Sequence, residues 1–259
     1  GCVSLGITNT FPMKKVIALC LILVVSSCAE LQQVVNNLPQ QGYGLTQEQI
    51  GQGLKQALDK GIDQQVTKLT QQDGFYRNEL VKIFLPEELQ KEDKGLRDIG
   101  LGNLADEGIK LLNRAAEDAV SEATPIFIDA VKDITFTDAK NILLGPDNAA
   151  TQYLSDKTTN ALYAKFNPVI SNSFAKVGAD QIWENLITRY NQIPFTQNVN
   201  PNLTDYVTQE ALKGVFTMIA VEENNIRDQV SSRTTDLLRR VFFFFYKIKY
   251  SRNILLINS

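Results

Sequence analysis

Hydrophobic residues recur along most of the chain at the three- and four-residue spacing of amphipathic helices. The first helix is expected to start after Thr46, whose hydroxyl caps it while Gln49 completes a capping box. Its apolar stripe consists of Ile50, Leu54, Ala57, Leu58, Ile62 and Val66. No stretch alternates for long between apolar and polar residues, as strands do. The pattern therefore predicts an all-α protein, a single compact domain of roughly eight to ten helices over residues 46–242.

Helix-breaking and helix-capping residues divide this domain. Asp73-Gly74 should end the first helix, and residues 104–122 have an apolar stripe with alanines that allow close packing. Residues 82–85 fit either a short strand or a buried loop. We expect further helices to open at Pro86, at Thr124-Pro125 and at Thr137. Asp147 should cap a long helix that is interrupted at residues 167–168, and Gly178 should be a C-cap. The last predicted helices cover residues 179–190, 203–225 and 233–241.

The region before the domain has the pattern of a bacterial lipoprotein signal. Lys14 and Lys15 form a basic start, residues 16–25 are a short apolar run, and small residues precede Cys28. The run is too short for a membrane span, and the small residues let a signal peptidase approach. We predict a signal peptide over 13–27 and acyl chains on Cys28, followed by a flexible tether over 28–45 that is rich in Gln, Asn and Gly. The alternative is an ordinary secretory signal in which Cys28 is incidental.

Both ends of the chain differ in composition from its body. Residues 1–12 carry no charge and precede the basic start at Met13, so we interpret them as translated upstream sequence; the alternative is an extended signal. Residues 243–259 continue a run of four Phe into a segment without acidic residues, Ala or Gly, which suggests a frameshift. We expect positions from about 244 on to lie outside the core. A membrane-touching tail is the alternative, although Lys247, Lys249 and Arg252 prevent a span.

Composition removes several function classes. The 259 residues include no histidine, and the three cysteines all lie at or before Cys28. The exported part therefore lacks imidazole bases, catalytic triads and Cys or His metal ligands, and we predict no catalytic residue, metal or cofactor. Residues 28–241 keep all 29 acidic residues but only 21 of the 26 basic ones, a net charge of −8. That charge argues against nucleic acid as a partner and leaves membrane attachment to the acyl chains on Cys28.

Several short motifs, in order, resemble one uncharacterised bacterial exported family, the domain-of-unknown-function family numbered 4197. The resemblance covers about residues 44–242 and implies a helical exported domain with no assigned activity. The motifs are Gly44-Leu45-Thr46, Asn113-Arg114-Ala115-Ala116-Glu117, Asp138-Ala139, Ile142-Leu143, Gly145-Pro146-Asp147, Ala149-Ala150-Thr151-Gln152-Tyr153, Tyr206-Val207-Thr208, Ala211-Leu212, Gly214, Phe216 and the stretch from Asp236 to Phe242.

The motif residues supply the candidate polar cluster of the chain. It consists of Asn113, Arg114, Glu117, Asp147, Thr151 and Tyr153. One interpretation is structural, with Asp147 as an N-cap and Tyr153 packed against residues 113–117. The other is a pocket in which the carboxylates act as acid and base, because no other side chains remain for that chemistry.

The sequence leaves two functions open. We predict a lipid-anchored helical module of the bacterial cell envelope, on the periplasmic side, which binds an unknown envelope protein or ligand. The alternative is an envelope hydrolase based on carboxylates. A polar pocket that gathers the candidate cluster would favour the second.

Overall fold

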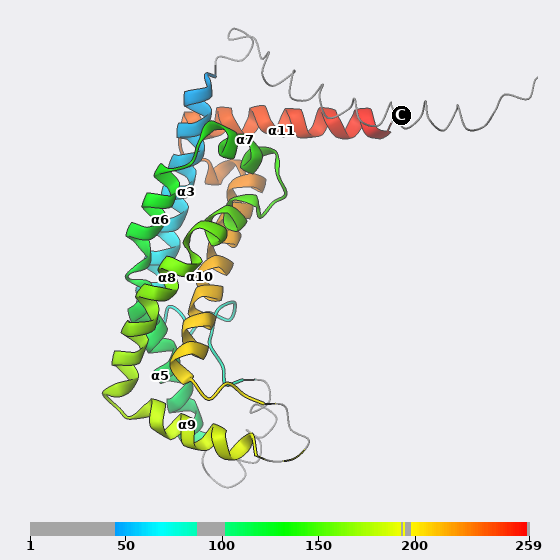
Figure 1. Cartoon of the computed structure of the whole chain (residues 1–259). Coiled ribbons are helices and arrows are strands. Elements are labelled where there is room, and N and C mark those ends of the chain that lie inside the picture. The colour runs from blue at the N-terminus through cyan, green and yellow to red at the C-terminus, as the bar shows by residue number, and fades with distance from the viewer. Residues whose placement is uncertain (1–44, 87–101, 193, 195–197, 258–259) are drawn as a thin grey trace, which may run out of the picture. The chain divides into compact units, whose positions relative to one another are not determined.

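Eight α-helices and one 3-10 helix lie in the part of the chain that the computed structural model describes, residues 45–86, 102–192, 194 and 198–257 (Figure 1). Those residues contain no strand, so the prediction of an all-α domain of roughly eight to ten helices is confirmed. The helices are α3 (Gln47–Thr70), α5 (Gly102–Val120), α6 (Ala123–Lys132), α7 (Phe136–Leu144), α8 (Ala149–Ala175), α9 (Ala179–Tyr190), α10 (Leu203–Asp228), η1 (Val230–Ser232) and α11 (Asp236–Ile257).

Some of the predicted features lie in residues outside the described part of the chain. The signal peptide, Cys28 and nearly all of the tether belong to residues 1–44, and most of the helix expected to open at Pro86 belongs to residues 87–101. Both segments lie outside the described residues, so these expectations stay predictions. Among the described helices, none combines the length and apolar character that crossing a membrane requires.

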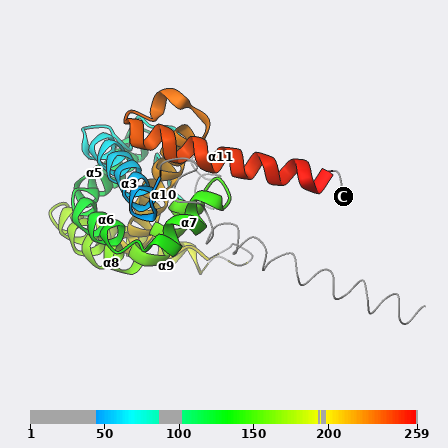
Figure 2. The same cartoon turned by 90° about the horizontal axis from the view of Figure 1, so that it is seen from above.

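The core forms where α10 packs against α8, α5 and α3, while α3 also contacts α6, α7 and α11. In the end-on view these helices are seen nearly along their axes, and α11 lies across them (Figure 2). The stripe predicted for α3 is buried in full, from Ile50 to Val66. Gly53 permits the crossing of α3 and α11, because a Cβ there would lie 2.8 Å from Val241 Cγ2. Burial of one face of each helix is what stabilises the arrangement.

Two helices, α6 and α7, start one or two residues away from the positions predicted from the sequence. Helix α7 is capped by Thr135 rather than Thr137: the Thr135 hydroxyl accepts from the Asp138 amide, and the Asp138 carboxylate accepts from the Thr135 amide. Helix α6 starts at Ala123, one residue before the predicted Thr124-Pro125 start. Pro125 still falls in the first turn, where its missing N–H costs no intrahelical bond.

The predicted interruption of α8 at residues 167–168 is wrong, because the helix runs through Pro168. A proline inside a helix costs about 3 kcal/mol. Phe166 and Ile170, on either side of it, are fully buried. Burying two such side chains contributes about 3–6 kcal/mol, which offsets the cost. The predicted C-cap at Gly178 is two residues too late, since Lys176 occupies the C-cap position of α8. Gly178 lies in the turn that follows, and its φ of 68° is in the left-handed region that suits glycine.

Helix α11 corrects the expectation for the C-terminal segment. It continues without a break from Asp236 to Ile257, and Phe244 and Phe245 are 7% and 5% exposed. These two positions are therefore buried, and the expectation that residues from about 244 on lie outside the core is wrong for them. A helical period explains the result, because the run of four Phe places some rings on the same side as Leu238 and Val241. The frameshift origin of the segment stays a prediction, and so does its alternative, a tail that touches the membrane.

Candidate binding groove beside residues 73–86

The structure divides the predicted polar cluster into two separate networks, one around Glu117 and one around Glu223. Asn113, Arg114 and Glu117 on α5 bond to the irregular segment 73–86 that follows α3. Thr151, at the start of α8, bonds instead to Glu223 on α10. The candidate residues thus lie in separate parts of the molecule and do not line one common pocket.

Glu117 holds the turn that begins at Asp73. Its Oε1 accepts from the amides of Phe75 (3.1 Å) and Tyr76 (3.4 Å), and its Oε2 accepts from the Asp73 amide (3.3 Å) and from Arg114 Nη1 (2.7 Å). Arg114 Nη2 also pairs with the Asp73 carboxylate at 2.8 Å. Asp73 has a φ of 67°, an uncommon backbone conformation that this network helps to hold. Glu117 is 4% exposed and has four donors, so it is a structural group.

Asn113 holds the same segment ten residues further on. Its Oδ1 accepts from the Ile83 amide at 2.8 Å, and its Nδ2 donates to the carbonyls of Ile83 (2.8 Å) and Ile109 (2.7 Å). The side-chain amide therefore pairs with Ile83 as a neighbouring strand would. The sequence left residues 82–85 open between strand and buried loop. The loop is confirmed, with Ile83 1% exposed and its backbone satisfied by a side chain.

Helix α10 supports the segment from the other side. Tyr206 Oη donates to the Phe84 carbonyl at 2.8 Å, and the Tyr206 ring stacks on Trp183 of α9. Gly214 allows the fully buried Phe75 to approach, since a Cβ there would lie 2.6 Å from the Phe75 ring. Segment 73–86 is thus fixed by α5 and by α10, and most of the residues that fix it belong to the motifs noted in the sequence.

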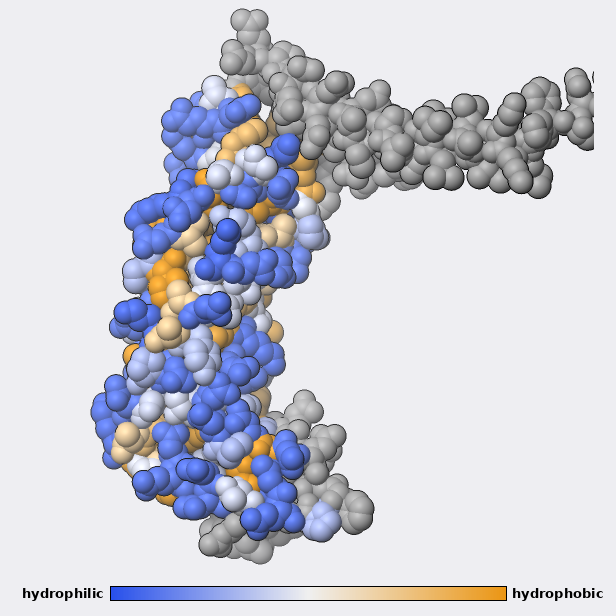
Figure 3. Space-filling view, in the orientation of Figure 1, coloured by the Kyte–Doolittle hydropathy of each residue, from blue (hydrophilic) through white to orange (hydrophobic). Residues whose placement is uncertain are grey.

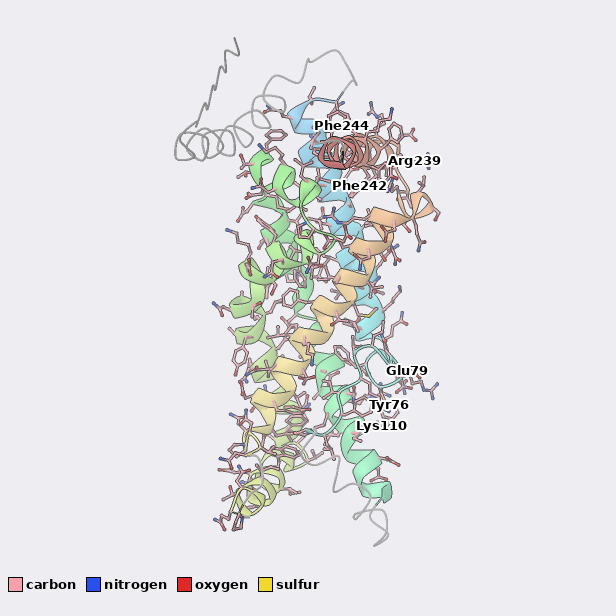
Figure 4. All side chains as sticks on the ribbon, turned by 90° about the vertical axis from the view of Figure 1, so that its right-hand side faces the viewer. Tyr76, Glu79, Lys110, Arg239, Phe242 and Phe244 are labelled. Atoms are coloured by element: carbon pink, nitrogen blue, oxygen red, sulfur yellow. The ribbon has the colours of Figure 1, made fainter. Side chains whose placement is uncertain are left out.

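A groove of about 390 Å³ lies between this segment and α10. This volume is within the range of small-ligand sites, roughly 300–1,000 Å³. Leu80 and Phe84 stay 63% and 45% exposed beside it, and Lys82 Nζ lies 4.4 Å from the centre of the Tyr76 ring. We call it the α10 groove; its lining is Leu80, Val81, Lys82, Phe84, Leu85, Pro86, Tyr206, Glu210, Lys213, Gly214 and Thr217. Figure 4 labels Tyr76 and Glu79 on the segment and Lys110 on the neighbouring α5, far from the residues labelled on α11.

The second network caps α8 and corrects the role predicted for Asp147. Glu223 accepts from the amides of Ala150 (2.9 Å) and Thr151 (2.8 Å), from the Thr151 hydroxyl (2.8 Å) and from Arg227. Asn148 occupies the N-cap position without a side-chain bond, and Asp147 is exposed on the turn before it. Asp147 is therefore not the cap, because a carboxylate from α10 already satisfies the first amides of α8.

Tyr153 is half-buried, and its placement also differs from the prediction. Burial raises the pKa of its hydroxyl, and the carboxylates of Asp138 and Asp133 raise it further. Lys157 Nζ lies 5.8 Å from the ring centre. The side chain of Tyr153 is therefore close to acidic groups of α7 and of the turn before it, and it is half-buried where the prediction had it mostly buried. Helix α8 contacts α5, α6, α7 and α10, so the neighbour that Tyr153 meets is a property of the tertiary structure.

The remaining acidic residues lie mainly on solvated surfaces. The face seen in Figure 3 is mostly hydrophilic over α3, α6 and α8, with hydrophobic residues in small patches. Asp129, which shares a helix face with Asp133, has a 76% exposed side chain paired with Lys132. In the described residues no group of three or more Cys, Asp or Glu side chains is placed to hold a metal ion.

Comparison with known proteins places the chain in a family. The family model described as protein of unknown function (DUF4197) matches residues 44–243, and the chain belongs to this family. The resemblance drawn from the motifs is therefore confirmed. No curated protein and no solved structure matches the chain.

Sequence reasoning missed several residues that complete the two networks, namely Asp73, Ile83, Tyr206, Glu223 and Arg227. One signal was available, because Glu223 and Arg227 have the i,i+4 spacing of a helical ion pair. The contacts of Asp73, Ile83 and Tyr206 join residues at least 30 positions apart, for which a single sequence has no comparable signal.

Proposed function

We propose that the protein is a lipid-anchored helical module of the bacterial cell envelope that binds an envelope protein through the α10 groove. Acyl chains on Cys28 attach it to the membrane, on the periplasmic side, and the tether carries the helical domain. The anchor follows from the short apolar run and the small residues before Cys28.

One observation carries the binding role. Asn113, Arg114, Glu117, Tyr206 and Gly214 all serve to fix segment 73–86, the wall of the groove. An irregular segment held so firmly, with Leu80 and Phe84 still exposed, is the usual construction of a preformed binding surface.

The same geometry weighs against the carboxylate hydrolase. Catalysis requires an acid with a free lone pair or proton that faces a substrate. Glu117 and Glu223 instead accept four and five hydrogen bonds from the protein. Glu210, the acid that lines the α10 groove, lies 3.6 Å from Lys213 and has no second acid beside it among the groove residues.

Photocrosslinking tests the binding role. A photoreactive phenylalanine at position 84 of the full chain, expressed in its own cells, should give a discrete crosslinked species. The same residue at position 182, where Ile182 is 68% exposed on α9, is the matched control and should give none. Tyr206→Phe, which removes the bond to the Phe84 carbonyl and keeps the ring, should weaken the crosslink at position 84. Equal crosslinking from both positions, or none from position 84, would contradict the proposal.

Metabolic labelling tests the anchor. A palmitate analogue should enter the wild-type chain and should be absent from Cys28→Ala. Cys20→Ala is the control, because Cys20 lies inside the apolar run and its replacement should leave labelling unchanged. Equal labelling of Cys28→Ala and the wild type would disprove acylation at this position.

A further inference from the structure

We propose that one face of α11 docks on the surface of an anionic lipid membrane. This α11 outer face consists of Arg239, Arg240, Phe243, Tyr246 and Lys247. Its position next to a membrane rests on the proposed acylation of Cys28, whereas its affinity for lipid depends on the face itself.

The face is continuous on the helix. Its five residues are exposed and follow each other at the one-, three- and four-residue steps of a single helical side. Phe243 and Tyr246 are 51% and 60% exposed, although large aromatic side chains are usually buried. The opposite side of α11 is buried through Leu238, Val241, Phe242 and Phe245. Packing thus fixes which side of α11 faces outward.

The chemistry of the face suits a lipid head-group layer. Basic side chains attract anionic lipids, and aromatic rings insert at the boundary between head groups and acyl chains. Lys247 Nζ lies 4.8 Å from the centre of the Phe243 ring, so charge and ring act at one place. Helix α11 carries five basic residues and one acidic residue, while the chain as a whole has a net charge of −3. An acidic body with one basic helix has a preferred orientation on an anionic surface.

The predicted tether is short. Eighteen residues, 29–46, separate Cys28 from the start of α3, and a tether of that length, if it is the flexible coil predicted from its composition, would span roughly 20–25 Å. Gly53, where α11 crosses α3, is only six residues into α3, or about 9 Å along its axis. Only a short stretch of chain therefore joins the proposed anchor at Cys28 to the part of α3 that α11 crosses.

A second copy of the chain fits this face less well. A symmetric pairing would bring the same surface of both copies together. Arg240 and Lys247 of one copy would then lie against a surface whose charged side chains are also basic, and like charges repel across an interface. Charge complementarity favours anionic lipid as the occupant.

Quenching by brominated lipids tests the proposal. The full chain is reconstituted into vesicles of zwitterionic and anionic phospholipid, some with bromine on their acyl chains near the head group. Phe243→Trp should lose much of its added fluorescence in the brominated vesicles. Leu80→Trp is the matched control, since Leu80 is 63% exposed on segment 73–86, and its added fluorescence should stay unchanged. The native Trp183, 7% exposed, provides the common background that is subtracted.

Charge reversal measures the electrostatic part. Arg240→Glu and Lys247→Glu, each added to Phe243→Trp, should reduce quenching, as should higher salt, because each basic residue near the surface contributes about fivefold in affinity. Lys165→Glu, the same reversal at an exposed position of α8, is the matched control and should leave quenching unchanged. An equal loss from Lys165→Glu would mean that net charge, rather than the α11 outer face, drives binding.

Three further outcomes would overturn the proposal: no quenching at position 243, equal quenching at positions 80 and 243, or crosslinking between copies through position 243 in detergent. Palmitate labelling of the same preparations separates the two proposals. Labelling without quenching at position 243 overturns docking and leaves the anchor standing. Quenching at position 243 without labelling supports docking and contradicts the anchor.

Discussion

Glu117 and Glu223 are two buried carboxylates that bind the same kinds of groups but have different effects on the fold. Each accepts from consecutive backbone amides and pairs with an arginine on its own helix. Glu117 holds an irregular turn, whereas Glu223 caps a regular helix, α8. The comparison shows that a carboxylate on a neighbouring helix can replace a local cap, and that the same device can hold a segment that has no regular structure.

The arginines paired with Glu117 and Glu223 differ in how deeply they are buried, and this difference predicts how much each carboxylate stabilises the fold. The side chain of Arg227 is 10% exposed and that of Arg114 is 28% exposed. Arg227 has one further acceptor, the Ile142 carbonyl, while Arg114 keeps a second carboxylate, Asp73. Loss of Glu223 therefore leaves a more deeply buried charge without a counter-ion than loss of Glu117 does.

Removing the buried carboxylate of Glu223 should give the largest effect. Glu223→Ala should lower the free energy of unfolding by about 3–5 kcal/mol, because a buried arginine and two amides lose their acceptor. Glu117→Ala should cost about 2 kcal/mol, since Arg114 keeps Asp73 and partial exposure. Denaturant unfolding of the purified full chain measures both. If Glu117→Ala proved the more damaging, exposure of the paired arginine would not be the deciding factor.

Asn113 offers a sharper test of how segment 73–86 is held. Asn113→Ala should cost about 2 kcal/mol, because the buried amide and carbonyl of Ile83 lose their partner. It should also speed hydrogen exchange at the Ile83 amide more than at the Phe75 amide, which Glu117 still holds. Asn113→Asp keeps the acceptor for the Ile83 amide but loses both donors, so its Ile83 amide should exchange at an intermediate rate. Equal acceleration at both amides would mean that the segment opens as one unit.

The N-cap of α7, which comes from the residue directly before the helix, provides a comparison for the cap that Glu223 of α10 supplies to α8. Thr135→Ala removes the hydroxyl that accepts from the Asp138 amide and should cost about 1 kcal/mol of unfolding free energy, the usual value for an N-cap. Thr137→Ala, two residues further on, is the matched control and should cost little. Denaturant unfolding again provides the measurement, and a loss as large as that of Glu223→Ala would show that remote and local caps are equivalent here.

The smallest effect concerns pH. The Thr135 hydroxyl and amide donate to the Asp138 carboxylate and hold the pKa of that group below its usual 3.8. A carboxylate with a depressed pKa adds stability above its unfolded pKa, and this stability disappears as pH falls through the folded pKa. Between about pH 5 and pH 2, Asp138→Asn should therefore lose less stability than the wild type. Parallel acid-unfolding curves for the two proteins would contradict this.

Much of the fold was predictable, because it depends on short-range signals. The apolar stripe of α3, the bounds of α9 and the turn at Gly178 all follow from residues within a few positions of each other. The cap of α7 was missed although its signal was local, since Thr135 and Asp138 have capping-box spacing. Helix α8 was divided at Pro168 because the burial of Phe166 and Ile170 cannot be read from their own segment.

The sequence by itself determined the helical class, the family and the residue types available for chemistry, because composition and short spacings carry that information. Only the tertiary structure decided that Asn113, Arg114 and Glu117 act on segment 73–86 while Thr151 belongs with Glu223. The physical reason is distance along the chain: Thr151 and Glu223 are 72 positions apart and Arg114 and Asp73 are 41 apart. Such pairs meet only after α3, α5, α8 and α10 bury their apolar faces against one another, and a buried amide then bonds to whichever carboxylate the packing brings to it.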